Sequence, residues 1–216
     1  EQSLMLARDF FGIKPVYYAE IDGHFVFASE IKSILAFPGY ERKVNQKALE
    51  QYLSFQYSPL EETFFRGIYK LMPGHMLLYK NGNYEIKTYF KTKLTPGKWN
   101  RKTNIDQLRS QLAEILKDSV KHHMLSDVEV GAFLSGGVDS GYLASSSGAD
   151  QAFTVGFDEG DRYSEVNKAA KVAEKAGLKH HVKIISKQEF WDALPDVMYH
   201  MDEPLADASA VALYFL

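Results

Sequence analysis

The chain has 216 residues, of which 45% are hydrophobic and 13% aromatic, enough for a packed core in one large or two modest domains. The net charge of −3 gives no electrostatic reason to expect nucleic acid or an anionic membrane as partner. The absence of cysteine excludes disulfides and thiolate metal sites. With no membrane-length apolar run and no visible signal peptide, we expect a cytoplasmic protein.

The first part of the chain, to about residue 90, predicts an α+β fold with antiparallel strands. Aromatic and β-branched runs flank Asp22-Gly23 and Asn81-Gly82, and such pairs are typical of two-residue β-hairpin turns. Between the hairpins, Ser29 is expected to cap a short helix, and a second helix is expected after Asn45.

A linker and then an α/β domain are predicted next. Residues 93–103 mix charges with Pro96-Gly97 and lack periodicity, which divides the chain into domains at 1–92 and 104–216. Thr103 is expected to cap a helix that continues to about His122. Strands are then predicted at Val128–Leu134, Ala152–Phe157 and His180–Ile185, and helices through Tyr142, at Ser164–Ala176 and at Lys187–Met201. This alternation predicts a parallel sheet whose ligands lie beyond the carboxyl ends of the strands.

The turn after the first of these strands, Ser135-Gly136-Gly137-Val138-Asp139-Ser140, predicts an anion site. Glycines allow close backbone approach, and the amides at a helix N-terminus attract negative charge. Asp139 suits such a site if Mg²⁺ bridges it to a phosphate. Gly156, at the end of the next strand, would let that strand's backbone reach an adenine edge. An ordinary Gly-Gly turn and an ordinary strand end are the alternatives.

Two further features have plain alternatives. The acidic loop Asp202–Ser209 is expected at the same sheet edge, although it also fits a solvated turn. The pairs His122-His123 and His180-His181 point apart on a helix and to opposite faces of a strand, so we expect surface or packing histidines and not a metal site.

The SGGVDS turn resembles the signature of the ATP pyrophosphatase (PP-loop) family, and Ala7 to Tyr18, ARDFFGIKPVYY, resembles the end of a class II glutamine amidotransferase domain. The second resemblance implies the C-terminal remnant of an N-terminal-nucleophile glutaminase domain. It also implies that Asp9 holds the α-amino group of glutamine; a strand-end ion pair of Arg8 and Asp9 is the alternative. The nucleophilic cysteine is absent, so this chain should not hydrolyse glutamine.

The two motifs in this order, followed by FTVGF and DEPLADAS, resemble glutamine-hydrolysing asparagine synthetases of the bacterial B type. The resemblance implies asparagine synthesis from aspartate, ATP and glutamine-derived ammonia through β-aspartyl-AMP, with ATP and Mg²⁺ bound and AMP and pyrophosphate released. Glu165 matches an acidic residue near the aspartate site, and Asp139 would hold Mg²⁺. The expected ATP and pyrophosphate residues are Phe133, Leu134, Ser135, Gly136, Gly137, Asp139, Ser140, Val155 and Gly156.

The chain departs from that family in two places. Gly141 replaces a frequent second serine, and a second Gly-rich acidic loop is not present before the chain stops within the apolar run Ala208–Leu216. We therefore expect a piece of a larger protein that does not make asparagine alone. A β-lactam synthetase-like ligase with another carboxylate and a non-catalytic nucleotide-binding fragment stay open as alternatives, as does a homodimer.

Overall fold

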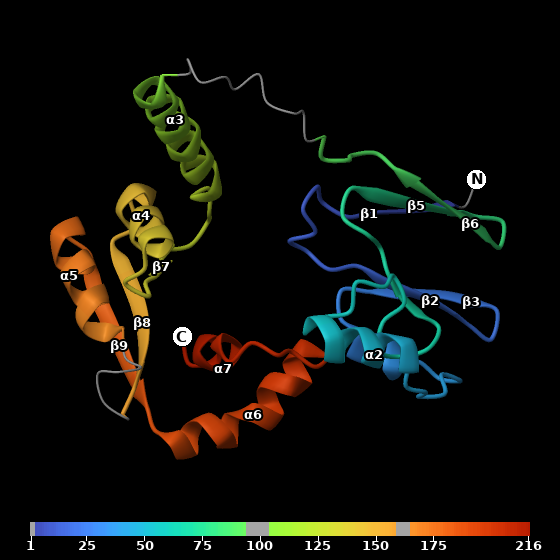
Figure 1. Cartoon of the computed structure of the whole chain (residues 1–216). Helices are drawn as coiled ribbons and strands as arrows, with labels where there is room; N and C mark the ends of the chain where they lie inside the picture. The colour runs from blue at the N-terminus through green and yellow to red at the C-terminus, as the bar shows by residue number, and fades with distance from the viewer. Residues whose placement is uncertain (1–2, 94–103, 159–164) are drawn as a thin grey trace. The chain divides into compact units, whose positions relative to one another are not determined.

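The computed structural model describes residues 3–93, 104–158 and 165–216 (Figure 1). The chain forms two compact units. The first consists of residues 1–95 and 198–207, and the second of residues 96–197 and 208–216. The predicted linker at 93–103 lies outside the described residues except for Lys93. That residues 198–207 belong with the first unit is a feature the sequence did not predict.

The first unit contains two three-stranded antiparallel sheets. One has the order β1 (Ser3–Ala7), β5 (His75–Lys80), β6 (Asn83–Thr88), and the other β3 (His24–Ala28), β2 (Tyr17–Ile21), β4 (Ile68–Lys70). The short α1 (Ile31–Leu35) and the longer α2 (Gln46–Phe55) also belong to this unit. The antiparallel fold predicted for this part is therefore confirmed.

Both predicted hairpin turns are confirmed, and the backbone shows why these residues form them. Asp22 and Gly23 have φ of 48° and 77°, and Asn81 and Gly82 have φ of 52° and 78°. Two consecutive positive φ values define the type I′ turn, which suits the twist of antiparallel strands and which Asn, Asp and Gly adopt most readily. The turns fix the register of β2 with β3 and of β5 with β6.

The two helices of the first unit begin in different ways. The helix α2 begins after Asn45, as predicted, and the side-chain oxygen of Asn45 caps it by accepting hydrogen bonds from the amides of Lys47 and Ala48. The prediction that Ser29 caps α1 was wrong. The N-cap position is Glu30, which makes no side-chain cap bond, and the carboxylate of Asp202 accepts from the first amides of α1.

The second unit contains the predicted parallel sheet, in the order β7 (Ala132–Phe133), β8 (Gln151–Phe157), β9 (Lys179–Ile185). Its helices are α3 (Ile105–His123), α4 (Val138–Ser147), α5 (Val166–Ala176) and α7 (Ser209–Tyr214). The helix α6 (Lys187–Met201) contains Pro195 and continues from this unit into the first. The α/β architecture predicted for this part is confirmed.

Two local predictions for the second unit need correction. The first strand is limited to Ala132–Phe133, and Val128, expected inside a buried strand, is 77% exposed. The cap of α3 is Asn104, whose side chain accepts from the amides of Asp106 and Gln107, while Thr103 lies outside the described residues. Both errors concern element ends, where apolar and capping signals from neighbouring residues compete.

Small side chains bring the elements around β7 close together. The core cluster here consists of Leu134, Ala144, Ala152, Ala169 and Ala173. Four alanines allow α4 and α5 to approach the sheet closely, so that the turn between β7 and α4 packs directly against the start of α5.

The start of α6 carries a reciprocal cap that should make this helix sensitive to acid. The amide of Ser186 donates to Glu189 Oε2 at 2.8 Å, and the amide of Glu189 donates to Ser186 Oγ at 3.2 Å. Hydrogen bonds from Lys183 and Ser186 lower the pKa of Glu189 to about 2. A depressed carboxyl pKa contributes stability above the unfolded value, 4.5, and loses it as pH falls toward about 2.

We therefore expect Glu189→Gln to unfold at a lower temperature than the parent at pH 6, with the difference shrinking as pH falls from about 4.5 to about 2. Thermal unfolding followed by circular dichroism at several pH values checks this. A difference that stays constant down to pH 2 would contradict the assignment.

Within the described parts of the chain, none of the helices combines the length and apolar character that crossing a membrane requires.

Candidate functional site

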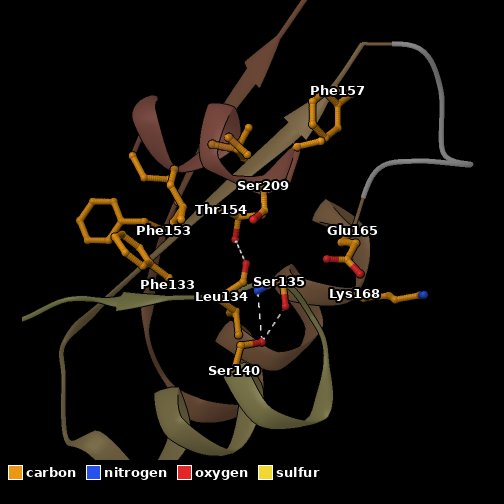
Figure 2. Close-up of a pocket in the computed structure, with 15 residues that line it drawn as sticks. Phe133, Leu134, Ser135, Ser140, Phe153, Thr154, Phe157, Glu165, Lys168 and Ser209 are labelled. Carbon is orange, nitrogen blue, oxygen red and sulfur yellow. Dashed lines mark hydrogen bonds between the residues drawn. The ribbon is translucent and has the colours of Figure 1, made fainter. Parts of the chain in front are cut away.

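A cavity of about 600 Å³ lies in the second unit, at the carboxyl ends of β7 and β8 (Figure 2). It is bounded by the turn after β7, by β8, by the first turn of α5 and by α7. The lining residues are Phe133, Leu134, Ser135, Ser140, Phe153, Thr154, Val155, Phe157, Glu165, Lys168, Ala208, Ser209, Ala212, Leu213 and Leu216. Its position agrees with the rule that ligands of parallel sheets bind beyond the carboxyl ends of the strands.

The turn between β7 and α4 is held by hydrogen bonds between its two serines. The Oγ atoms of Ser135 and Ser140 are 2.9 Å apart, and the amide of Ser135 donates to Ser140 Oγ at 3.2 Å (Figure 2). Ser140 Oγ also donates to the carbonyl of Gly137 at 3.3 Å. The turn is therefore folded back on itself, with both hydroxyls at the cavity.

The turn requires glycine at position 136. The φ of Gly136 is +77°, and a Cβ at this position would lie 2.7 Å from Lys168 Cβ and 2.9 Å from the amide nitrogen of Ala169. Only glycine combines this backbone conformation with so close an approach to α5. In the part of the chain that the structure describes, no side chain caps the first amides of α4. An uncapped helix N-terminus of this kind has amides that are able to bind an anion.

Thr154 fixes the strand end from which the turn starts. Its side chain is almost fully buried, and its hydroxyl donates to the carbonyl of Leu134 at 2.6 Å. The hydroxyl lies 2.7 Å from His180 Nε2, which is then the donor of that bond. Burial, followed by the neighbouring charge of His181, lowers the pKa of His180.

Replacing Thr154 with valine should destabilise the second unit by about 1–3 kcal/mol, because the Leu134 carbonyl and His180 Nε2 would lose a buried partner. Thr154→Ser keeps the hydroxyl and is the matched control. Denaturant unfolding measures both variants. If the valine and serine variants were equally stable, the Thr154 hydroxyl would not contribute to the free energy of unfolding of the second unit.

The structure brings together some of the predicted nucleotide residues at this cavity. Phe133, Leu134, Ser135, Ser140 and Val155 line it, and so does Glu165, the candidate for the aspartate site. Gly136, Gly137, Asp139 and Gly156 lie in the same turn and strand but are not among the lining residues. Figure 2 shows the Glu165 carboxylate turned toward the centre of the cavity.

Other lining residues were not predicted from the sequence. Lys168 follows Glu165 by one helical turn on α5, so the helical period could have placed it at the cavity. Ser209, at the end of the loop that was expected at this sheet edge, lines the cavity from α7. Leu213 of the same helix also lines it, and the sequence has no local signal for the position of Leu213.

Gly141, which departs from the family pattern, is a buried helical position with room for a larger side chain. An added Cβ would lie 3.5 Å from Val172 Cγ1, an ordinary contact. Because alanine has a higher helix propensity, we expect Gly141→Ala to stabilise the second unit by about 0.5–1 kcal/mol. Denaturant unfolding measures the stability of both proteins. A variant less stable than the parent would contradict the prediction.

Asp9, the predicted glutamine residue, lies in the first unit and organises its own loop. Its carboxylate accepts from the amides of Phe11 at 3.1 Å, Ile13 at 2.9 Å and Lys14 at 2.9 Å. The amides of Lys14 and Ile13 are the main reason that the pKa of Asp9 is lowered. The neighbouring guanidinium of Arg8 donates to three backbone carbonyls.

The histidine pairs make local contacts. His122 and His123 each bond a backbone carbonyl one turn earlier in α3, and the ring of His181 stacks on Phe153 at 4.9 Å between centroids. Among the described residues, no group of three or more His, Cys, Asp or Glu could hold a metal ion.

Two protein families match this chain. The glutamine amidotransferase domain matches residues 1–90, and asparagine synthase matches residues 111–216. The chain is 39% identical to asparagine synthetase [glutamine-hydrolyzing] 1 of Bacillus subtilis, over 97% of this chain and 33% of that protein. A putative asparagine synthetase [glutamine-hydrolyzing] of Mycobacterium tuberculosis is 36% identical over 100% of this chain and 34% of its own length.

The amidase chyE of Penicillium rubens is also similar, with 29% identity over 97% of this chain and 34% of that protein. The chain thus spans about a third of the length of the curated relatives it matches. The amidotransferase match covers the antiparallel sheets, and the synthase match covers the parallel sheet and its cavity. The chain belongs to the family of glutamine-hydrolysing asparagine synthetases.

Proposed function

We propose that the cavity of the second unit binds ATP together with Mg²⁺. The observation that carries the proposal is the folded turn at residues 135–140, which places two hydroxyls and the uncapped amides of α4 beside the end of β8. The triphosphate would lie against this turn. The adenine would lie between Phe133 and Val155, where exposed aromatic surface and a strand backbone are available.

The donor set suits Mg²⁺ bound with the nucleotide. Asp139 supplies one exposed carboxylate in the turn, and Mg²⁺ is commonly held by one or two carboxylates plus substrate phosphates. The metal would neutralise the pyrophosphate as it leaves. In this assignment Asp139 holds the metal, and Gly136 and Gly137 let the phosphates approach the backbone.

In the whole protein we propose that an aspartate carboxylate oxygen attacks the α-phosphorus of ATP. The bond to the β-phosphate breaks, giving β-aspartyl-AMP and pyrophosphate. Ammonia then attacks the acyl carbon, releasing AMP, a proton and asparagine. Glu165 faces the cavity and would attract the α-amino group of aspartate.

The first unit would take part through glutamine. Asp9 is proposed to hold its α-amino group, and the backbone amides that already bind this carboxylate keep it ionised and oriented. Because the chain contains no cysteine, hydrolysis of glutamine would need a nucleophile that this chain does not supply.

A second candidate keeps the adenylation step but changes the carboxylic acid. This candidate is retained because two relatives of the chain are named as amidases and not as asparagine synthetases. Pyrophosphate release by the whole protein with a panel of carboxylic acids distinguishes the two. Release with aspartate supports asparagine synthesis, and release only with another acid supports the second candidate.

Titration calorimetry of this chain with ATP and Mg²⁺ tests the nucleotide site. We expect ATP to bind more tightly than AMP. Asp139→Asn should weaken binding about 10- to 150-fold, because it removes the charge that would hold the metal, and contacts to charged groups contribute about 1.5–3 kcal/mol. Asp150→Asn, an exposed change at the opposite end of β8, is the control. If the parent and Asp139→Asn bound Mg-ATP equally well, the proposal that Asp139 holds the metal would be refuted.

A further inference from the structure

A chain of hydrogen bonds runs from β9 through β8 to the turn between β7 and α4, entirely within the second unit. It joins the ring of His180, the hydroxyl of Thr154, the peptide between Leu134 and Ser135, and the hydroxyl of Ser140. We call this chain the relay, and Figure 2 shows its part from Thr154 to Ser140. His180 is not among the residues that line the cavity, so the relay connects the cavity to a side chain outside it.

The strand β7 ends where a side chain takes the place of the backbone ladder. The amide of Leu134 still donates to the carbonyl of Phe153 at 2.9 Å, as it would in a parallel sheet. The carbonyl of Leu134, however, accepts from the Thr154 hydroxyl at 2.6 Å. Leu134 is itself buried, and both of its backbone groups are bonded to β8. The chain therefore leaves the sheet at a fixed point.

The peptide that joins Leu134 to Ser135 carries this restraint into the turn. It is trans and planar, so its C=O and its N–H point in opposite directions. Holding the Leu134 carbonyl therefore also orients the amide of Ser135, which donates to Ser140 Oγ at 3.2 Å. Ser140 Oγ then donates to the carbonyl of Gly137 at 3.3 Å. The buried hydroxyl of Thr154 thus fixes how the backbone enters the turn.

His180 orients the hydroxyl of Thr154. Thr154 has a single hydroxyl proton, which goes to the Leu134 carbonyl, so the 2.7 Å bond to His180 Nε2 requires the ring to be the donor. Burial, followed by the charge of His181, lowers the pKa of His180, so at pH 7 the ring is neutral with its proton on Nε2. All donors of the relay then point the same way, an arrangement in which each hydrogen bond polarises the next.

We propose that Thr154 and His180 are positioning residues for the nucleotide site, which hold the turn between β7 and α4 in its phosphate-binding conformation through the relay. This role rests on the proposed function of the cavity. A turn that is already ordered loses less conformational entropy when a phosphate binds. His180 should therefore raise the affinity for Mg-ATP although it does not line the cavity.

Three variants of the whole chain test this role. His180→Phe keeps an aromatic ring and removes the donor. His180→Gln is the rescue variant, because the side-chain amide of glutamine can donate a hydrogen bond to Thr154 in place of Nε2. His181→Phe is the matched control. His181 follows in the same strand but points to the opposite face, where it stacks on Phe153, and phenylalanine keeps that stacking.

Titration calorimetry with Mg-ATP measures the effect on the site. We expect His180→Phe to weaken binding about fivefold, if the fraction of chains with the turn in place falls to about a fifth. His180→Gln should recover most of this loss, and His181→Phe should match the parent. If both phenylalanine variants weakened binding equally, or if glutamine restored nothing, His180 would serve only the general stability of the sheet and the proposal would be wrong.

A double-mutant cycle of His180→Phe with Ser140→Ala tests the relay by denaturant unfolding, without nucleotide. Changes at residues that share no partner usually add, to within about twofold in the unfolding equilibrium constant. Losing the His180 donor should loosen the Ser135 amide, so that Ser140→Ala has a smaller effect in the His180→Phe background. We expect this coupling to be about three- to tenfold in that constant. The cycle of His181→Phe with Ser140→Ala should be additive.

Nitrogen NMR of the His180 ring gives a spectroscopic test of the same relay. The parent should show a neutral ring with its proton on Nε2. A proton on Nδ1 alone, or additive effects of His180→Phe and Ser140→Ala, would overturn the proposal. A parent chain that binds no Mg-ATP would count against the proposed function of the cavity. The ring spectrum and the cycle would still decide whether the relay holds the turn.

Discussion

Replacing Gly136 with alanine is expected to destabilise the second unit by about 2–5 kcal/mol and to abolish Mg-ATP binding. The positive φ of +77° costs an alanine about 1–2 kcal/mol. The new Cβ would lie 2.7 Å from Lys168 Cβ and 2.9 Å from the Ala169 amide nitrogen, and relieving such overpacking costs about 1–3 kcal/mol. Relief would push the turn away from α5 and into the cavity. Denaturant unfolding and calorimetry measure the two effects.

Gly148→Ala separates the two causes. Gly148 has φ of +71°, but nothing lies within 4 Å of an added Cβ. This control should therefore show only the backbone cost, about 1–2 kcal/mol, and should bind Mg-ATP like the parent. Equal losses of stability in both variants would show that the approach to α5 is not as close as described.

Replacing Arg8 with alanine is expected to destabilise the first unit by about 2–4 kcal/mol. The guanidinium donates to the carbonyls of Leu71 at 2.8 Å, Gly12 at 3.0 Å and Lys14 at 3.1 Å. Losing charged hydrogen bonds of this kind costs about 1.5–3 kcal/mol each in buried settings, and less here because the side chain is only partly buried. Thermal unfolding measures the loss.

Arg42→Ala is the matched control in the same unit, because Arg42 is exposed. It should change stability by less than about 0.5 kcal/mol. The alanine change at Arg8 should also speed amide exchange across residues 11–14, whose loop would lose its support while Asp9 remains. Unchanged exchange there would mean that Asp9 holds the loop by itself.

Much of the fold was predictable because local signals and tertiary packing agree. The pairs Asp22-Gly23 and Asn81-Gly82 leave few backbone choices, so the two hairpins could be predicted. The parallel sheet followed from alternating strands and helices of ordinary length. The turn at residues 135–140 was recognisable because its glycines, serines and following helix occur in one short stretch.

What the sequence did not predict depends on contacts between distant residues. Asp202 lies far along the chain from Ile31, so the cap of α1 was assigned to nearby Ser29. The acidic loop was expected at the sheet edge, but its first two residues bind the first unit and only its end reaches the cavity. The contacts of Asp202 with Ile31 and of Glu203 with Phe64 produce no local pattern in the sequence. A carboxylate can bind any amide that the fold brings near it.

The most direct test of the account is a crystal structure of this chain with Mg²⁺ and an ATP analogue whose α–β bridge resists cleavage. We predict phosphate density against the amides of residues 136–140, a metal ion between Asp139 and the phosphates, and the adenine beside Val155. A nucleotide bound elsewhere, or a turn at residues 135–140 that stays folded on itself without phosphate while the analogue saturates the protein, would contradict the account.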